Sequence, residues 1–269
     1  MASQIKAKYL GWVFLRAGLP LSALTISIYM LAPHVTYDVL AQFPGQLANI
    51  HLGAWAAAIT LTFISLWAVG RYDGVAHQYF ATRVPQHQAR AASTISIALA
   101  QTLGFGVFTG ALARWRVMRD VSFTTSLKLS AFVSVSFMQC WAVLTATICL
   151  MFRAPEWTYV PSVLTLYLAP FALFSMFRWP KLVFKGYQFR FPNLQSSAVI
   201  FWWTFVDTTA AAGAMFVLMP SGSDISFTLF LPLFLLALGT AVLSNTPGGV
   251  GPFELMMLGL LPQLPAGEV

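Results

Sequence analysis

The stretch Ser244-Asn245-Thr246-Pro247-Gly248-Gly249-Val250-Gly251-Pro252-Phe253-Glu254 lies within otherwise apolar sequence and decides how this chain folds. Its two prolines and three glycines cannot belong to a regular helix, because proline removes a backbone donor and clashes with the preceding turn. Pro252 suits the first turn of a new helix, where the Glu254 carboxylate would meet the positive end of the helix dipole. The stretch therefore predicts a broken segment followed by a second helix.

The sequence around that stretch is typical of a membrane protein. Of its 269 residues, 58% are hydrophobic and 9% are charged, whereas a soluble domain carries about 25% charged residues. We predict an all-α integral membrane protein in which residues 1–269 form a single polytopic membrane domain with no soluble domain. It should have about six transmembrane helices plus one or two re-entrant or broken glycine-rich segments. The apolar runs are residues 11–32, 50–70, 91–113, 127–152, 161–177, 194–219 and 227–243, with a short one at 253–261.

The positions of the basic residues predict the topology. If the N-terminus is cytoplasmic and every run crosses the membrane, eight basic residues face outside, namely Arg114, Arg116, Arg119, Lys128, Arg178, Lys181, Lys185 and Arg190. If residues 91–113 instead enter the membrane and return to the same side, thirteen of the fifteen Lys and Arg residues face the cytoplasm. The positive-inside rule favours this second arrangement. The thirteen are Lys6, Lys8, Arg71, Arg83, Arg90, Arg114, Arg116, Arg119, Lys128, Arg178, Lys181, Lys185 and Arg190.

Small and polar residues interrupt the run 91–113. Non-helical backbone at membrane depth is tolerated only where protein or a water-filled cavity satisfies its polar groups, so we expect a re-entrant hairpin that faces a cavity. The alternative is an ordinary helix whose Gly106-x-x-x-Gly110 pair packs against a neighbouring helix. The interrupting residues are Gln101, Thr102, Gly104, Gly106, Thr109 and Gly110.

The two interrupted segments also resemble each other slightly. Gln101-Thr102-Leu103-Gly104 is similar to Asn245-Thr246-Pro247-Gly248. Paired interrupted segments in two halves of a chain are a sequence indication of a transporter's binding site. We therefore expect Gly104, Gly106, Gly110, Asn245, Pro247, Gly248, Gly249 and Gly251 to form the re-entrant or broken parts of such a site.

The motif LSNTPGGVGPFE resembles the PGGLGxxE signature of the membrane domain of the lysylphosphatidylglycerol synthase/flippase family, the multiple peptide resistance factor family. LGFGVFTGALARWRVM is similar to that family's glycine-rich stretch with its Arg-x-Arg, and VDTTAAAGAMFVLMP to its helix with an embedded acid. The resemblance covers roughly residues 50 to 262, with the motifs in the family's order. It implies a bacterial inner-membrane location and an aminoacylated phosphatidylglycerol as the lipid.

This sequence departs from the family in two respects. The given sequence does not include the soluble aminoacyltransferase domain of the transferase members, so we expect either a shortened member or a fragment of a longer gene product. We expect no lysine transfer by this polypeptide alone. The signature also has Val250 and Pro252 where a leucine and a non-proline residue are commoner. We expect a translocator of aminoacyl-phosphatidylglycerol or a related polar lipid. The alternatives are the membrane portion of a phosphatidylglycerol lysyltransferase and a membrane scaffold for a partner enzyme.

Five charged residues are the candidates for substrate binding. Asp207 lies within an apolar run, where a carboxylate is costly and should face the bundle interior, a partner or a cavity. Asp207 and Glu254 would neutralise the ammonium groups of the lipid. Arg114 and Arg116 either hold its phosphate with a guanidinium fork or anchor the hairpin by extending to the interface. Asp73 either pairs locally with Arg71 or lines a cavity entrance.

No catalytic residue, metal or cofactor is expected from the sequence. The four histidines lack metal-ligand spacing, and the glycines at 104–110 match neither a dinucleotide fingerprint nor a P-loop. No basic stripe with interleaved aromatic residues suggests nucleic-acid binding. The expected partners are a phospholipid and the membrane, together with a possible second copy of the chain.

Overall fold

The computed structural model describes residues 18, 20–104, 106–118, 120–152, 154–178, 181–184, 187–190, 194–220 and 225–261. The prediction of a cytoplasmic N-terminus falls outside these residues. A short apolar helix, Pro20–Leu31, comes first. The elements that follow are α2 (Tyr37–Asn49), α3 (Leu52–Tyr79), α4 (Gln86–Leu103), α5 (Gly106–Val117), α6 (Phe123–Met151), η1 (Glu156–Thr158), α7 (Tyr159–Arg178), β1 (Lys181–Phe184), β2 (Tyr187–Arg190), α8 (Leu194–Phe216), α9 (Phe227–Ser244), η2 (Pro247–Gly249) and α10 (Pro252–Leu260).

Four helices in the described residues are long and apolar enough to cross a membrane, namely α3, α6, α8 and α9. The longest begin at capping residues, since Ser122 accepts a hydrogen bond from the backbone of Thr125 at the start of α6. At the start of α3, the His51 ring accepts one from Gly53. The helical architecture is compatible with a membrane protein, as the sequence predicts.

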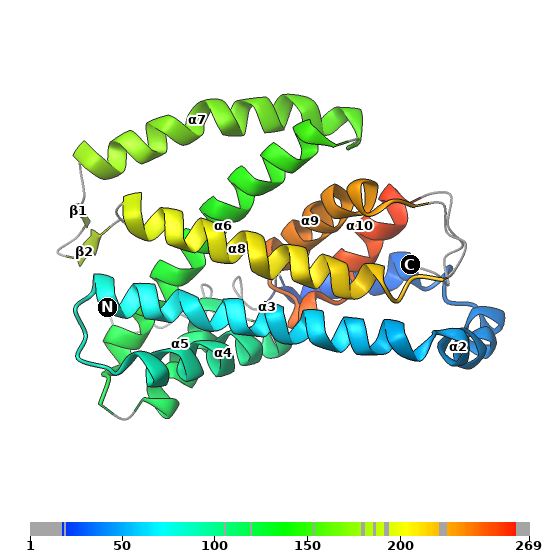
Figure 1. Ribbon diagram of the computed structural model, residues 1–269, viewed down its shortest axis with the longest axis horizontal. Helices are drawn as coiled ribbons and strands as arrows, with labels where there is room; N and C mark the ends of the chain where they lie inside the picture. The colour runs from blue at the N-terminus through cyan, green and yellow to red at the C-terminus, as the bar shows by residue number, and fades with distance from the viewer. Residues whose placement is uncertain are drawn as a thin grey trace, which may run out of the picture.

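The long helices form a frame with two distinct ends (Figure 1). Helices α3 and α8 lie side by side and run in opposite directions, because Leu61 contacts Gly213 while Ser65 meets Asp207. Helix α6 crosses them obliquely and is antiparallel to α3, with Tyr79 stacked on Phe132 at a centroid distance of 5.0 Å. We call the end with segments 80–85 and 118–122 the basic end, and the opposite one the far end.

Each end has its own apolar core. The core at the basic end joins the last turns of α3 to the beginning of α4, the first half of α6 and Ile200 of α8. The core at the far end joins the last turns of α6 and α8 to both α9 and α10, from Phe230 to Leu261. Because apolar packing is concentrated at the ends, the middle of the bundle is left for the interrupted segments.

Helices α4 and α5 form a hairpin with its base at the basic end (Figure 1). Helix α4 ends at Leu103, and Gly104 turns the chain with φ of +74°, a conformation that L side chains rarely adopt. The Thr109 hydroxyl donates to the Gly104 carbonyl at 2.8 Å and satisfies an acceptor left open by the break. The interruption expected within residues 91–113 is therefore a tight turn between two packed helices, rather than a small-residue contact on one continuous helix.

A second hairpin enters from the far end and consists of α9, η2 and α10 (Figure 1). Its arms are joined by Phe234 and Phe253, whose ring centroids lie 5.7 Å apart, and by a 3.2 Å hydrogen bond from the Thr240 hydroxyl to the Pro252 carbonyl. By length α9 could cross a membrane. In the fold it ends at Asn245, which adopts a left-handed conformation, and the chain turns back into α10.

Two elements differ from the sequence expectation. The segment between the apolar runs 11–32 and 50–70, from which hydropathy predicts no helix, contains α2, whose first turn has Asp38 and is capped by the Thr36 hydroxyl. The expectation of an all-α fold is also incomplete, because β1 and β2 pair as an antiparallel hairpin with Lys181 opposite Arg190. Both elements lie outside the apolar runs, where hydropathy carries no information about local structure.

Candidate functional site

The tips of the two hairpins contact each other inside the bundle. A Cβ atom added to Gly104 would lie 2.9 Å from the Asn245 carbonyl oxygen and 3.2 Å from the Pro247 nitrogen. A Cβ atom added to Gly106 would lie 3.3 Å from the side-chain oxygen of Asn245. The backbones of two segments far apart in the sequence can approach this closely only because position 104 has no side chain.

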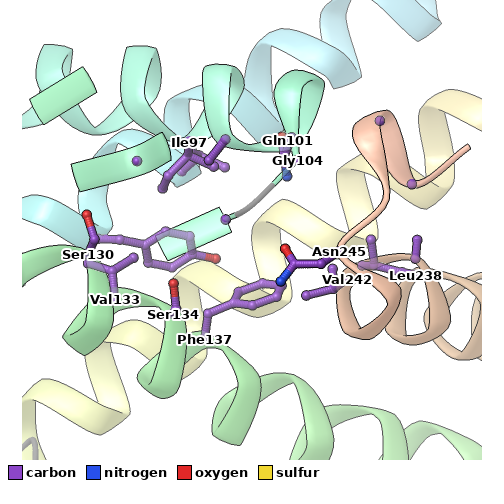
Figure 2. Close-up of a pocket in the computed structure, with 18 of the residues that line it drawn as sticks. Ile97, Gln101, Gly104, Ser130, Val133, Ser134, Phe137, Leu238, Val242 and Asn245 are labelled. Carbon is purple, nitrogen blue, oxygen red and sulfur yellow. The ribbon is translucent and has the colours of Figure 1, made fainter. Parts of the chain in front are cut away.

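A cavity of about 310 Å³ lies beside this contact. Figure 2 shows Ile97 and Gln101 on the first hairpin, Ser134 and Phe137 on α6, and Asn245 extending from the second hairpin between them. The expected segment residues Gly104, Gly106, Gly110, Asn245, Gly248 and Gly249 all line the cavity. Its polar lining also includes Tyr72, Gln101, Arg114, Ser130, Ser134, Asp207 and Thr246.

Arg114 faces inward and is neutralised by Asp73. Its Nε and Nη2 donate to the two carboxylate oxygens of Asp73 at 2.7 and 2.6 Å, and its Nη1 donates to the Ser130 hydroxyl at 2.9 Å. The exposed fractions of the two charged side chains are 2% and 0%. The expected pairing of Asp73 with Arg71 is therefore wrong, as is the alternative in which Arg114 extends to the interface. The ion pair instead ties α3 to the first hairpin and to α6.

Asp207 is the cavity carboxylate that no described cation neutralises. The Ser65 hydroxyl donates to its Oδ1 at 2.5 Å, and the Tyr72 hydroxyl lies 3.4 Å from its Oδ2 and 3.3 Å from the Thr204 hydroxyl oxygen. Within the described ranges, the Arg114–Asp73 pair is the single salt bridge. Asp207 is 9% exposed, so its charge is held in the bundle by hydroxyl groups alone.

The helix ends add to the negative potential of the cavity. The C-terminal ends of α4 and α9 both reach it, and each carries roughly half a negative elementary charge. The N-terminal end of α5, at Gly106, offsets one of these ends. Because Arg114 and Asp73 cancel, Asp207 and the remaining helix end leave the cavity negative. Such a cavity favours a cation.

The other predicted binding residues lie outside this cavity. The Glu254 carboxylate accepts a 2.6 Å hydrogen bond from the Gly251 backbone and so caps α10. Arg116 is exposed and its guanidinium carbon lies 5.0 Å from the centroid of the Trp115 ring. Pro247 and Gly251 belong to the second tip but do not line the cavity. Gly251 instead packs against Ser27, because a Cβ atom added to Gly251 would lie 2.5 Å from the Ser27 Cβ atom.

The structure adds residues that the sequence does not single out. Ser65 and Tyr72 face Asp207, while the Ser130 hydroxyl accepts a hydrogen bond from Arg114. Serine and tyrosine are common in apolar helices, so nothing in their local sequence marks them. Ser65 and Tyr72 are separated by seven residues, or two helical turns, so they share a face of α3. That spacing becomes informative only once Asp207 is placed opposite it.

The cavity has exposed polar residues at the hairpin tips. Gln101, Asn245 and Gly248 are all exposed and line the cavity. Their sequence neighbours Leu103 and Leu243 are also exposed, at 58% and 69%. The cavity is therefore partly open at the hairpin tips.

The fold and site define a helical protein with four helices suited to crossing a membrane and a polar cavity at the contact between two helix breaks. The chain is 27% identical over 240 residues to an uncharacterized protein of Synechocystis sp., slr0712, and the alignment covers 83% of this chain and 72% of that protein. No protein-family model matches the chain. The flippase resemblance therefore depends on the motifs quoted above.

Proposed function

We propose that this chain is an integral membrane translocator that moves the headgroup of a cationic lipid past the hairpin tips. The observation that carries the proposal is the negative cavity around Asp207, which has exposed polar residues at the hairpin tips. If this opening faces the hydrocarbon, as the proposal requires, a lipid can reach it while its acyl chains stay in the membrane. The motif resemblance supplies the lipid class, an aminoacylated phosphatidylglycerol.

In this mechanism the Asp207 carboxylate takes the ammonium group of the headgroup. The exposed Gln101 and Asn245 amides replace part of its hydration at the opening. Arg114 retains N–H groups that have no partner among the described residues, and these would face the lipid phosphate. The protein lowers the desolvation barrier, which is the main obstacle to moving a charged headgroup through hydrocarbon.

The test is reconstitution of the full chain into liposomes with fluorescent lysyl-phosphatidylglycerol or unmodified phosphatidylglycerol. We expect the chain to equilibrate the lysyl lipid between leaflets, and Asp207→Asn to slow this at least roughly thirty-fold, as for truncation of one partner of a buried charge pair. Glu156→Gln is the matched control, because Glu156 is an exposed carboxylate in η1 at the far end.

Three outcomes would count against the proposal. Equal movement of both lipids would show that the cavity does not select a cation. Unchanged transport by Asp207→Asn would remove Asp207 from the site while leaving translocation intact. Failure of the wild-type chain to move either lipid would contradict translocation itself.

A further inference from the structure

Arg71 on α3 lies against two indole rings on the outside of the α3–α8 seam. Its guanidinium carbon is 4.1 Å from the centroid of the Trp67 ring and 5.1 Å from that of Trp203 on α8. The two rings meet edge to face at an angle of 86°, with centroids 5.0 Å apart. Two helices thus hold the guanidinium in one place. We call Trp67, Arg71 and Trp203 the indole cage.

The cage carries positive charge that no described carboxylate balances. Arg90 on α4 lies near this part of α3, because its carbonyl oxygen would lie 3.4 Å from a Cβ atom added to Gly70, the residue before Arg71. Arg90 is exposed. In the described part of the chain, neither arginine forms an ion pair with an acidic side chain. Two adjacent cations without a counterion indicate a site for an anion.

Stacking leaves the hydrogen-bonding edge of Arg71 available. The face of an indole ring stacks against a guanidinium group, while the N–H donors point outward in the guanidinium plane. That planar fork matches the oxygens of a phosphate group. An arginine that only extends to the interface does not need two rings to fix it, so the cage favours a bound anion over simple interfacial anchoring.

The depth of the cage suits a lipid phosphate. Arg71 precedes the end of α3 at Tyr79 by a rise of about 12 Å, and Trp203 follows the start of α8 at a similar depth. Helix α3 is about 42 Å long, so it exceeds a hydrocarbon core of about 30 Å. The cage therefore lies toward the headgroup region of the basic end, not at the centre of the hydrocarbon.

An apolar stripe extends from the cage toward the far end. Residues four positions apart share a helix face, and this series on α3 is exposed along its length. The exposed fractions are 55% for Trp67, 68% for Phe63 and 54% for Ile59. A lipid whose phosphate met Arg71 would lay an acyl chain along this stripe. A free anion would use only the cage.

We propose that the indole cage and Arg90 bind the phosphate of an anionic phospholipid from the leaflet at the basic end, with its acyl chain along Phe63 and Ile59. The site lies on the outer face of α3, whereas Ser65 and Tyr72 hold Asp207 from another face. The bound lipid would brace the α3–α8 pair that positions the cavity carboxylate. This inference does not depend on the lipid that the cavity moves.

The experiment uses the purified full chain, delipidated in detergent. Phosphatidylglycerol, phosphatidylcholine or inorganic phosphate is added, and the retained lipid and the melting temperature are measured. We expect phosphatidylglycerol to be retained and to raise the melting temperature, with a smaller effect of phosphatidylcholine and none of phosphate alone. Arg71→Gln should weaken retention at least about tenfold, as expected for loss of charge-assisted hydrogen bonds.

Arg83→Gln is the matched control, because Arg83 is an exposed arginine at the same end outside the cage. Arg90→Gln is the second variant if Arg71→Gln does not fold, since Arg90 is exposed on α4, and it should also weaken retention. Arg71→Lys should lose much of the retention, because it keeps the charge but not the planar fork. Equal loss in Arg83→Gln, or full retention in both Arg71→Gln and Arg90→Gln, would overturn the proposal. An equal effect of inorganic phosphate would identify an anion site without lipid recognition.

Discussion

Arg114 and Asp73 form a two-pronged ion pair in which the Nε and Nη2 atoms each meet a different carboxylate oxygen. The pair joins the returning arm of the first hairpin to α3, and both side chains are almost completely buried. Buried pairs of this kind are worth little relative to apolar residues of the same shape, but breaking one leaves an uncompensated charge. The pair therefore specifies where the hairpin sits against α3.

Removing one partner of this pair should destabilise the fold strongly. We expect Asp73→Asn or Arg114→Gln to cost about 3–5 kcal/mol in the free energy of unfolding, because the remaining charge has no buried partner. Replacing both residues, by Asp73→Leu with Arg114→Met, should recover most of that loss. Chemical denaturation in detergent would measure the three variants. If the double variant is as unstable as the singles, the loss is not due to the orphaned charge.

Gly104→Ala should separate the two hairpin tips. The methyl group would lie 2.9 Å from the Asn245 carbonyl oxygen, and alanine at φ of +74° is strained by about 1–2 kcal/mol in addition. We expect a lower melting temperature and impaired lipid movement. Gly259→Ala is the control, because an alanine there meets nothing within 4 Å. A thermal unfolding curve for Gly104→Ala that matches wild type would contradict the tip contact.

The hydroxyl groups around Asp207 should tune its affinity for a cationic headgroup. Ser65→Ala removes a 2.5 Å donor and should change the apparent affinity for lysyl-phosphatidylglycerol by about tenfold, as for a hydrogen bond to a charged group. Tyr72→Phe should have a smaller effect, since its oxygen lies 3.4 Å away. Thr60→Val is the control, because that hydroxyl bonds only within α3. The rate of lipid movement between leaflets, measured as a function of lysyl-phosphatidylglycerol concentration, would test all three variants. Equal effects in Thr60→Val would show a general perturbation of the helix.

Glu254 offers a test between capping and substrate binding. As the cap of α10, its oxygen accepts from the Gly251 backbone, and a glutamine oxygen can do the same. Glu254→Gln should then be mild, while Glu254→Ala should cost about 0.5–2 kcal/mol of stability. If Glu254 instead binds the ammonium, as the sequence motif suggests, Glu254→Gln should slow transport as much as we expect for Asp207→Asn. Stability and transport measured on the same two variants separate these roles.

The general architecture is readable from the sequence, for definite reasons. Hydropathy locates the long helices, because hydrocarbon requires continuous apolar runs. Gly104 and the residues 245–251 indicate the two breaks, because their backbone conformations are closed to most other residues. Asp207 can be identified as a candidate because a carboxylate within a membrane-spanning segment is energetically costly and usually functional.

The partners of these residues are not readable from one sequence. Asp73 has a cation two positions away in Arg71, yet it pairs with Arg114 on another element, whereas Arg71 stacks on two indoles. Local spacing cannot choose between these pairings, because the choice depends on how the hairpin docks. The same holds for α9, whose length suits a crossing but whose end meets the tip at Gly104.

The contact between the hairpin tips also imposes an order on biosynthesis. Because chains emerge from the N-terminus first, α4 and α5 are made long before the residues 245–251 that cover their tip. Until that segment arrives, Gly104 lacks the Asn245 and Pro247 backbone that packs against it. The last hairpin to leave the ribosome thus completes the first, and a chain interrupted before Asn245 would contain every residue of the earlier hairpin without the surface that closes it.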